Sequence, residues 1–423
     1  MLTQEENERL CRVGPGTPMG DLMRRCWHPI AGSSELEVES PRRVRVLGED
    51  LALYSDRQGR PGLLGLHCPH RKASLEYGIP EAEGLRCCYH GWLFDREGRC
   101  LEQPAESPSS TFKDRIQHTA YPVEELGGLV FAYLGPRPAP LLPRYDVFVW
   151  EDAWRDVGTA EVPCNWLQCM ENSVDVTHVD YLHGLFYDWA MTRLGRPPRP
   201  KSERAFGGAR HVRMDFELFP HGIVKHRLVA GASEDSAAWQ EGTNPLVFPN
   251  MTRAGGRGSL QIRVPVDDTH TLCFMYSCYR PNDGQPVPRQ ESVPIYRVPL
   301  MADDGKYRVD WITGQDMMAW ATQGPVMDRT DEKLGASDQG IIFFRQVLFD
   351  QLTAIERGED PLGVIRDPAQ NTIILLKGQE EGSRVGFMDN HWQQFSPIYK
   401  EARALLTRSR ERGQPAEAGA ARS

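Results

Sequence analysis

The sequence predicts an α+β protein in which an antiparallel β domain is followed by a larger domain with an antiparallel sheet and helices. Short strand-like runs alternate with turn residues from about Trp27 to Pro136. Beyond the proline-rich stretch GPRPAPLLPRYDVF, longer strand-like runs are mixed with helix-like segments. A chain of 423 residues is long enough for two or three domains.

The first 26 residues are expected to form a helical segment. The glycines of GPGTPMGDLMRRCW follow no strand and lack the G-x-G-x-x-G spacing of a nucleotide-binding loop. Thr17 and Pro18 are instead typical of a helix N-cap followed by proline at the first helical position.

Residues 27–140 are expected to form the β domain, with strands in RRVRVLGEDLALYSD, GRPGLLGLHC, GWLFDREGRCLEQ and GGLVFAYLGP. Residues 141–400 are expected to form the second domain. A helix should begin near Asn165, and further helices are expected in GQDMMAWATQGPVMDRT and ASDQGIIFFRQVLFDQLTAIERG. Its strands are expected in ARHVRMDFELF, HGIVKHRLVAG, SLQIRVPVD and HTLCFMYSCYR. The end, RSRERGQPAEAGAARS, is small and polar, and residues 401–423 are expected to be a disordered tail.

The composition excludes several classes of function. A net charge of −9 argues against nucleic-acid and anionic-membrane binding. The opening MLTQEENERL lacks the features of a signal peptide, and no apolar run reaches the length of a membrane span. A cytoplasmic location is therefore expected. In a reducing compartment, clustered cysteines indicate metal ligands or reactive thiols rather than disulfides.

One cluster of cysteines and histidines lies in LHCPHRKASLEYGIPEAEGLRCCYHGW, residues 66–92. Two pairs, Cys68 with His70 and Cys87 with His90, can each occupy a loop tip, and such a set could bind zinc or a [2Fe–2S] cluster. Each loop supplies one ligand of each kind, whereas a zinc finger usually opens with two cysteines and closes with two histidines. The order therefore favours a two-iron cluster with both cysteines on one iron and both histidines on the other.

CPHR and CCYHGW resemble the motif C-x-H-x(15–17)-C-x2-H of the Rieske non-haem iron oxygenases. The resemblance implies that Cys68, His70, Cys87 and His90 bind a Rieske [2Fe–2S] cluster. His67 and Cys88 are assigned no iron. High-potential Rieske proteins have a disulfide between these loops, and this chain lacks its cysteines, so a lower-potential cluster that feeds a catalytic iron is expected.

A second set of candidate ligands lies in ENSVDVTHVDYLHG. Asn172, Asp175 and His178 follow at i, i+3 and i+6 and would share one side of a helix. His183 lies roughly 140° around an ideal helix from His178. Both can bind one metal only if the helix is interrupted, which predicts a π-bulge or kink near residues 179–182. Gly184 suits a helix end.

This pattern resembles the D-x2-H-x4-H motif of Rieske oxygenase catalytic domains. The resemblance implies that His178 and His183 bind a mononuclear ferrous iron and that Asp175 connects it to the cluster of a neighbouring subunit. Asn172 is interpreted either as a nearby support or as a helix-surface amide. A facial triad of two histidines and one carboxylate leaves positions open for O2 and substrate.

The third ligand must come from elsewhere in the chain. GQDMMAWATQG resembles the iron-ligand helix of the family, which favours Asp316, with Asp328 as the next choice. The full set of candidate carboxylates is Asp310, Asp316, Asp328, Asp331 and Asp338.

The resemblance extends from VGPGTPMGDLMRRCWHPI to ERGEDPLGVIRDP. The long form of the chain is similar to the phthalate 4,5-dioxygenase branch, and PCNWLQCMENSVD, QIRVPVDDTHT and GQDMMAWATQG look most like aryl O-demethylase oxygenases of the dehydrodivanillate type. For the fold, the resemblance implies a Rieske domain and a catalytic domain of the helix-grip type, with a curved antiparallel sheet covered by helices.

For function, the resemblance implies the terminal oxygenase component of a homotrimer. It would use O2 and electrons from a separate NAD(P)H-dependent reductase, with or without a ferredoxin, to oxidise a small aromatic substrate. O-demethylation or monooxygenation is expected, and cis-dihydroxylation of the phthalate type is the alternative. A non-enzymatic electron carrier and a zinc-stabilised binding protein are more distant alternatives.

Substrates of this branch are often aromatic carboxylates, which would require a cation in a mostly apolar pocket. The candidates are Lys225, Arg227, Arg253 and Arg263.

Overall fold

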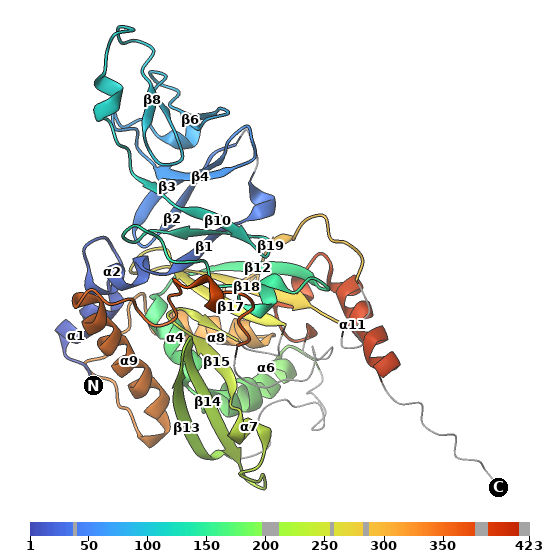
Figure 1. The fold of residues 1–423 in the computed structure, drawn as a ribbon. Helices are drawn as coiled ribbons and strands as arrows, with labels where there is room; N and C mark the ends of the chain where they lie inside the picture. Colours follow the sequence, from blue (N-terminus) through green and yellow to red (C-terminus); the bar gives the residue numbers. More distant parts are fainter. Residues whose placement is uncertain (37–39, 197–210, 254–257, 282–286, 377–387, 414–423) are drawn as a thin grey trace.

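The computed structural model describes residues 1–36, 40–196, 211–253, 258–281, 287–376 and 388–413. It divides into a small β region of three sheets and a larger region with one large sheet and most of the helices (Figure 1). This is the α+β architecture that the sequence predicts. No helix of the described ranges combines the length and apolar character that crossing a membrane requires.

The N-terminal segment forms two short helices, α1 (Gln4–Cys11) and α2 (Pro18–Arg24). The side chain of Thr17 accepts a hydrogen bond from the Gly20 amide and Pro18 is the first helical residue, so the predicted cap is confirmed. Both helices lie against the larger region, near α9 (Gln339–Glu356) (Figure 1).

The β region contains three antiparallel sheets, as expected. Its strands are short and separated by turns, and the sheet nearest the tip packs on a small core that includes Leu75, Leu85 and Phe94. The sheets, in spatial order, are β1 (Trp27–Gly32), β11 (Leu129–Tyr133) and β10 (Val123–Leu126); β2 (Arg42–Val46), β3 (Glu49–Ser55), β4 (Pro61–Gly65) and β9 (Ala120–Tyr121); and β5 (Ile79–Pro80), β6 (Leu85–Arg86), β7 (Leu93–Phe94) and β8 (Cys100–Glu102).

The larger region is built on one eight-stranded sheet. Its strands, in spatial order, are β13 (His211–Phe219), β14 (Gly222–Val229), β15 (Thr243–Val247), β16 (Met251–Thr252), β17 (Ser259–Pro265), β18 (Thr271–Tyr279), β12 (Trp154–Val162) and β19 (Ile295–Arg297). The expectation of a purely antiparallel sheet is wrong at one edge, where β19 runs parallel to β12. This follows from the order of the strands: β18 runs antiparallel to β12 and ends beside its first residue, Tyr279 opposite Trp154, so the chain enters β19 from the end at which β12 begins.

Helices cover this sheet. Two of them, α4 (Trp166–Val174) and α8 (Ile312–Thr322), pack against each other, and α4 also contacts β17 and α9. Asn165 caps α4 by accepting a hydrogen bond from the Leu167 amide, and the helix begins where the sequence predicts. The remaining short elements are α3 (Asp146–Val149), α7 (Ala237–Gln240), η1 (Ser33–Glu35), η2 (Leu75–Tyr77), η3 (Phe112–Arg115), η6 (Ala336–Asp338) and η7 (Pro368–Gln370).

The helix after Asn165 is not continuous, which corrects the expectation that Asn172, Asp175 and His178 share one helical side. It ends at Val174, because the Asp175 carboxylate accepts hydrogen bonds from the amide and hydroxyl of Thr177 and favours a turn over another helical turn. The chain continues through α5 (His178–Asp180), a π-helix η4 (Tyr181–Phe186) and α6 (Tyr187–Arg193). The predicted π-helical interruption is therefore confirmed.

The expectation that disorder begins at residue 401 is wrong up to residue 413. Helix α11 (Tyr399–Gly413) follows η8 (Trp392–Phe395), and its apolar positions Ala402 and Leu406 pack on Tyr279 of the sheet. Four-residue spacing of buried side chains is the signature of a packed helix, and the polar composition of the chain end conceals it. Residues 414–423 lie outside the described residues.

Candidate metal centres

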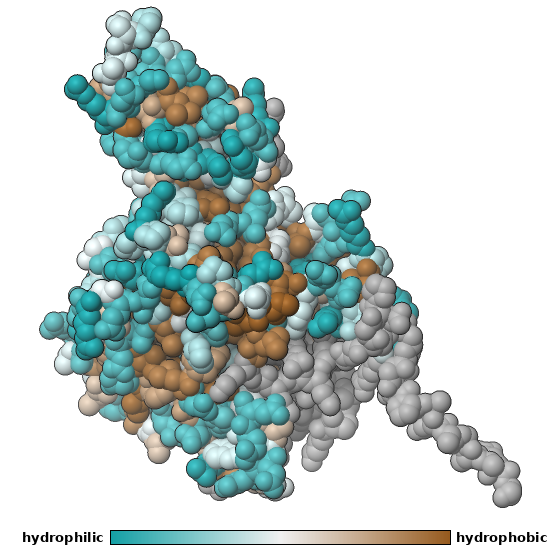
Figure 2. Space-filling view, viewed as in Figure 1, coloured by the Kyte–Doolittle hydropathy of each residue, from teal (hydrophilic) through white to brown (hydrophobic). Residues whose placement is uncertain are grey.

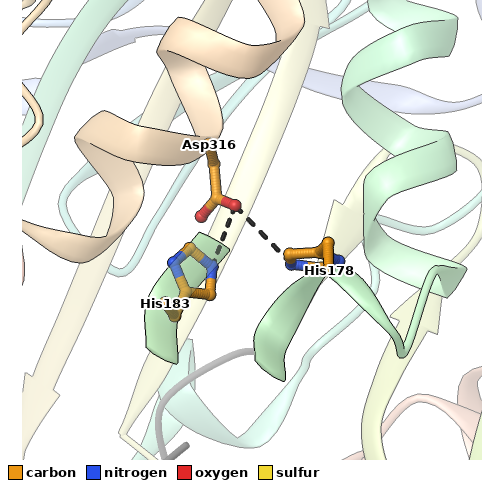
Figure 3. A group of neighbouring side chains, drawn as sticks. All are labelled: His178, His183 and Asp316. Carbon is orange, nitrogen blue, oxygen red and sulfur yellow. Dashed lines mark ion pairs between the residues drawn. The ribbon is translucent and has the colours of Figure 1, made fainter. Parts of the chain in front are cut away.

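Two histidines and one aspartate meet in the larger region (Figure 3). His183 Nε2 lies 3.0 Å and His178 Nε2 lies 3.6 Å from the same oxygen, Asp316 Oδ1. One ligand atom from each residue lies within 4.8 Å of the others. Two imidazole nitrogens and one carboxylate oxygen at this spacing form a donor set that fits a divalent metal such as ferrous iron.

Three different elements bring this group together. His178 begins α5, His183 lies in the π-helix η4, and Asp316 lies in α8, far along the chain. In a regular α-helix, residues five apart point in different directions. The wider π-helical turn lets both imidazoles face Asp316, which gives the interruption a local function.

The group is mostly buried, and its charges depend on one another. The side chain of His183 is 4% exposed and that of Asp316 is 9% exposed. Burial raises the pKa of Asp316, but the charges and hydrogen bonding of His183, with His178 and Arg263, outweigh it and keep the pKa below its usual value. Asp316 is therefore an anion and can serve as a metal ligand.

A second layer of residues supports the group. Gln315 Oε1 lies 3.0 Å from His183 Nδ1, Asp175 Oδ2 lies 3.5 Å from His178 Nδ1, and Asn172 Nδ2 donates to Asp316 Oδ1 at 3.3 Å. The contact of Asn172 with Asp316 favours its interpretation as a support over that of a surface amide. Burial raises the pKa of Asp175, but interactions with His178 and Thr177 lower it overall to about 2.

The other candidate carboxylates do not join this group. Each is engaged elsewhere: Asp310 pairs with Arg308 and Arg196, Asp328 accepts a hydrogen bond from Thr330, Asp331 pairs with Lys333, and Asp338 accepts one from Gly335.

A pocket opens beside the three residues, and several cations line it. Lys225, Arg227 and Arg263 come from strands β14 and β17. Burial, reinforced by Arg227 and Arg263 and opposed by Asp175, lowers the pKa of Lys225 to about 7. Arg253, the fourth candidate, is not among the lining residues and forms a buried ion pair with Asp146 instead.

Sequence reasoning missed several residues around this pocket. His391 is buried and lines the pocket from the C-terminal segment, which carries no recognisable motif. A buried ion cluster stands behind α4, where Glu171 binds both Arg329 and Arg345. Gln315 directly precedes Asp316 in the sequence, but only the tertiary structure reveals its contact with His183.

The four cluster-ligand candidates lie on two neighbouring loops. Cys68 and Cys87 are 1% and 2% exposed, and their thiols interact with each other. His70 and His90 lie closer to the surface, with ring centroids 4.4 Å apart. The buried sulfurs and outward imidazoles fit a two-iron cluster with the histidine side turned to solvent.

Backbone hydrogen bonds shape both loops. Cys68 N donates to Ala73 O at 2.9 Å, and Cys87 N donates to Trp92 O at 2.8 Å. Lys72 and Gly91 turn the two loops with positive φ angles. The residues assigned no iron differ from the four candidate ligands: Cys88 is exposed, and His67 Nδ1 bonds to the backbone oxygen of Lys72.

Comparison with known proteins gives a consistent result. Residues 26–120 match the model of the Rieske [2Fe–2S] domain, and residues 295–379 match the model described as LigXa C-terminal domain like. The chain is 42% identical over 380 residues to the 5,5'-dehydrodivanillate O-demethylase oxygenase subunit of Sphingobium sp. strain SYK-6, covering 89% of this chain and 86% of that protein. It is 34% identical to the phthalate 4,5-dioxygenase oxygenase subunit of Pseudomonas putida, covering 86% of this chain and 89% of that protein.

Two solved structures share the fold. NdmA of Pseudomonas putida CBB5 aligns with a TM-score of 0.58 and 16% identity, covering 90% of this chain and 100% of that one. The terminal oxygenase of carbazole 1,9a-dioxygenase from Nocardioides aromaticivorans IC177 aligns with a TM-score of 0.57 and 20% identity, covering 84% and 97%. With relatives above 30% identity over most of its length, the chain belongs to the Rieske non-haem iron oxygenases, as a terminal oxygenase subunit.

Proposed function

We propose that His178, His183 and Asp316 bind a mononuclear ferrous iron, and that Cys68, His70, Cys87 and His90 bind the [2Fe–2S] cluster. The grouping of two imidazoles and one carboxylate beside a pocket is the observation that carries the proposal. When bound, the two centres would supply stored electrons and O2 activation. The chain itself supplies the ligands, the buried surroundings and the pocket that orients the substrate.

The substrate that this pocket fits best is an aromatic acid with a methoxy group. Lys225, Arg227 and Arg263 offer positive charge to a carboxylate, and the relative with 42% identity is an O-demethylase subunit. O-demethylation would consume the methoxy group, O2, two electrons and two protons and release a phenol, formaldehyde and water. Electrons would come from a separate reductase, with or without a ferredoxin, since the relatives are subunits of larger systems.

A substrate panel tests this activity. The full chain, with both metals and an active electron donor, would be given methoxylated benzoates and phthalates, and the products scored for formaldehyde and for diols. Formaldehyde in amounts equal to the phenol is expected. Diol formation from phthalate without formaldehyde would support the alternative, a cis-dihydroxylating dioxygenase, which the 34% identity to a phthalate dioxygenase subunit favours.

The role of the cations is tested by Lys225→Met. We expect KM for a methoxybenzoate to rise by about tenfold or more, because the variant leaves the carboxylate without one charged partner, and we expect KM for the corresponding methyl ester to change little. Arg253→Met, at a buried cation away from the pocket lining, is the control for loss of a buried charge. An equal change of KM for acid and ester would contradict the assignment.

We further propose that the active unit is a homotrimer. In one chain the cluster loops lie in the small β region and the helices α4 and α6 in the larger region (Figure 1), so in the proposed trimer the cluster of one copy would approach the pocket of another. Apolar side chains are exposed in both regions. Around the cluster loops they include Ile79 and Phe112, and along η4 and α6 they are Tyr181, Leu185 and Trp189. Figure 2 shows an apolar patch on the face of the small β region.

The mass of the protein in solution tests the assembly. A trimeric mass is expected for the wild type and for Ile342→Glu, which places the same charge at an exposed apolar position of α9. Leu185→Glu is expected to yield monomers. A monomeric wild type would contradict the trimer.

Asp175 is proposed to connect the two centres across this interface. Asp175→Asn should keep both metals but slow the oxidation of the reduced cluster by about 10- to 100-fold, the usual range for a residue that supports a metal ligand. Stopped-flow absorbance of the cluster measures this step. Unchanged turnover with an active reductase would exclude the connecting role.

A further inference from the structure

The side-chain amide of Gln315 connects the imidazole of His183 to the backbone of Val309. It lies in α8 directly before Asp316 and is fully buried. Its Oε1 lies 3.0 Å from His183 Nδ1, and its Nε2 donates to the backbone oxygen of Val309 at 2.9 Å. Both ends of the amide are therefore engaged.

These two contacts determine where the protons lie. A backbone carbonyl only accepts hydrogen bonds, so the NH2 end of the amide must face Val309 O. The carbonyl end then faces His183 and can only accept, so His183 Nδ1 must carry a proton. In the neutral imidazole, Nε2 consequently has the lone pair, and Nε2 is the nitrogen 3.0 Å from Asp316 Oδ1.

The second histidine has a different support. His178 Nδ1 lies 3.5 Å from a carboxylate oxygen of Asp175 and makes no hydrogen bond among the described residues. One imidazole is thus backed by a neutral amide at hydrogen-bond distance, and the other by a charged group at a longer distance. The orientation of His183 is the better defined of the two.

We propose that Gln315 is a positioning residue, which fixes His183 in the Nδ1–H tautomer and aims its Nε2 at the metal position shared with Asp316. The proposal deepens the proposed iron site and rests on it. Since Gln315 and Asp316 are neighbours on α8, this helix orients two of the three ligands, one directly and one through the amide. Metal affinity should depend on the amide even though it touches no metal.

The test uses the full chain with its cluster intact. Fe(II) affinity at the mononuclear site would be measured by competition with a chelator. Gln315→Leu removes the acceptor and should weaken Fe(II) binding by about 10- to 100-fold. Gln315→Glu keeps an acceptor facing His183 but turns its second oxygen toward Val309 O, so its Fe(II) affinity should fall between those of Gln315→Leu and the wild type. Gln323→Leu, at an exposed residue at the end of the same helix, should bind Fe(II) normally.

A second measurement requires no variant. In protein labelled with 15N-histidine, with the cluster oxidised and Zn(II) in place of the ferrous iron, the ring nitrogen shifts of His183 should report a protonated Nδ1 and a metal-bound Nε2. Binding through Nδ1, or wild-type Fe(II) affinity in Gln315→Leu, would overturn this inference alone. Failure of the wild type to bind a second iron would overturn the proposed iron site and this inference together.

Discussion

The two candidate metal centres of this chain are built in different ways. The cluster loops come from one stretch of the sequence, residues 66–92, and rest on their own small core. The group of His178, His183 and Asp316 needs a π-helix, a distant helix and buried supporting residues to come together. The first centre is local, whereas the second depends on the tertiary structure. Distant substitutions should therefore disturb the second centre more than the first.

The largest effect is expected from removing a ligand of the second centre. Asp316→Ala should abolish binding of the mononuclear iron and lower turnover by more than about 100-fold, the upper figure for residues that only support a ligand. The visible spectrum of the cluster should be unchanged, because the cluster loops belong to the small β region and rest on their own core, whereas α8 belongs to the larger region (Figure 1).

Iron analysis distinguishes the two centres in this variant. Asp328→Ala is the matched control, since Asp328 is exposed and accepts hydrogen bonds only from Thr330 among the contacts described. Loss of cluster iron from Asp316→Ala would contradict the independence of the two centres. Full iron content in the same variant would contradict the assignment of Asp316.

The next largest effect is expected from the buried ion cluster behind α4, which supports the second centre from a distance. Arg329 is fully buried and binds both carboxylate oxygens of Glu171, at 2.8 and 2.7 Å. Arg329→Met leaves Glu171 with Arg345 alone and should lower the free energy of unfolding by about 3–5 kcal/mol. Chemical denaturation followed by tryptophan fluorescence measures this loss.

An exposed ion pair offers the comparison. Arg9 pairs with Glu356 at the surface, where removal of one partner, as in Arg9→Met, should cost no more than about 1 kcal/mol. If both variants lost the same stability, the buried cluster would not be a special support of α4.

The local construction of the first centre and the tertiary construction of the second also explain how well the sequence predicted each of them. The four candidate cluster ligands were proposed from a compact motif, and the cap at Thr17 and the helix start near Asn165 from neighbouring residues. The helix break at Asp175, the parallel pairing of β19 and the packing of α11 were not anticipated. Each depends on a competition or contact that no local pattern records, such as the burial of Ala402 and Leu406 against Tyr279.

The same holds within the second centre. His178, His183 and Asp316 were proposed from motifs, and the structure brings them together. Gln315 and His391 were missed, because a buried glutamine or histidine is common in cores and becomes informative only when its neighbours are known. Arg253 was wrongly grouped with the pocket cations, because it follows directly after β16 and pairs with the distant Asp146, a contact that no local pattern records.

A pH effect on stability is expected from Lys225, which lines the pocket beside the second centre. Burial, with Arg227 on the same strand and Arg263 on β17, lowers the pKa of Lys225 to about 7, against the opposing charge of Asp175. Between that pKa and the usual value near 10.4, the unfolded chain binds more protons than the folded one. The free energy of unfolding should therefore rise with pH across this window.

Denaturant unfolding at pH 6.5, 8 and 9.5 — about the lower end, middle and upper part of this window — measures the trend. Lys225→Met should remove the part of the slope that comes from this residue, and Lys306→Met, at an exposed lysine, should keep it. An unchanged slope in Lys225→Met would show that the buried lysine is not the cause.

The smallest effect is expected from a substitution in the first centre, at a cysteine that neighbours a candidate ligand. Cys87 and Cys88 are neighbours, yet one thiol is buried facing Cys68 and the other is exposed. Cys88→Ser should leave the cluster spectrum and iron content unchanged and alter stability by less than about 0.5 kcal/mol, whereas Cys87→Ser should lose the cluster. In a centre defined by a short local motif, the direction in which a side chain points determines which of two adjacent cysteines can bind the cluster. Loss of the cluster in Cys88→Ser would mean that the loop presents its thiols differently.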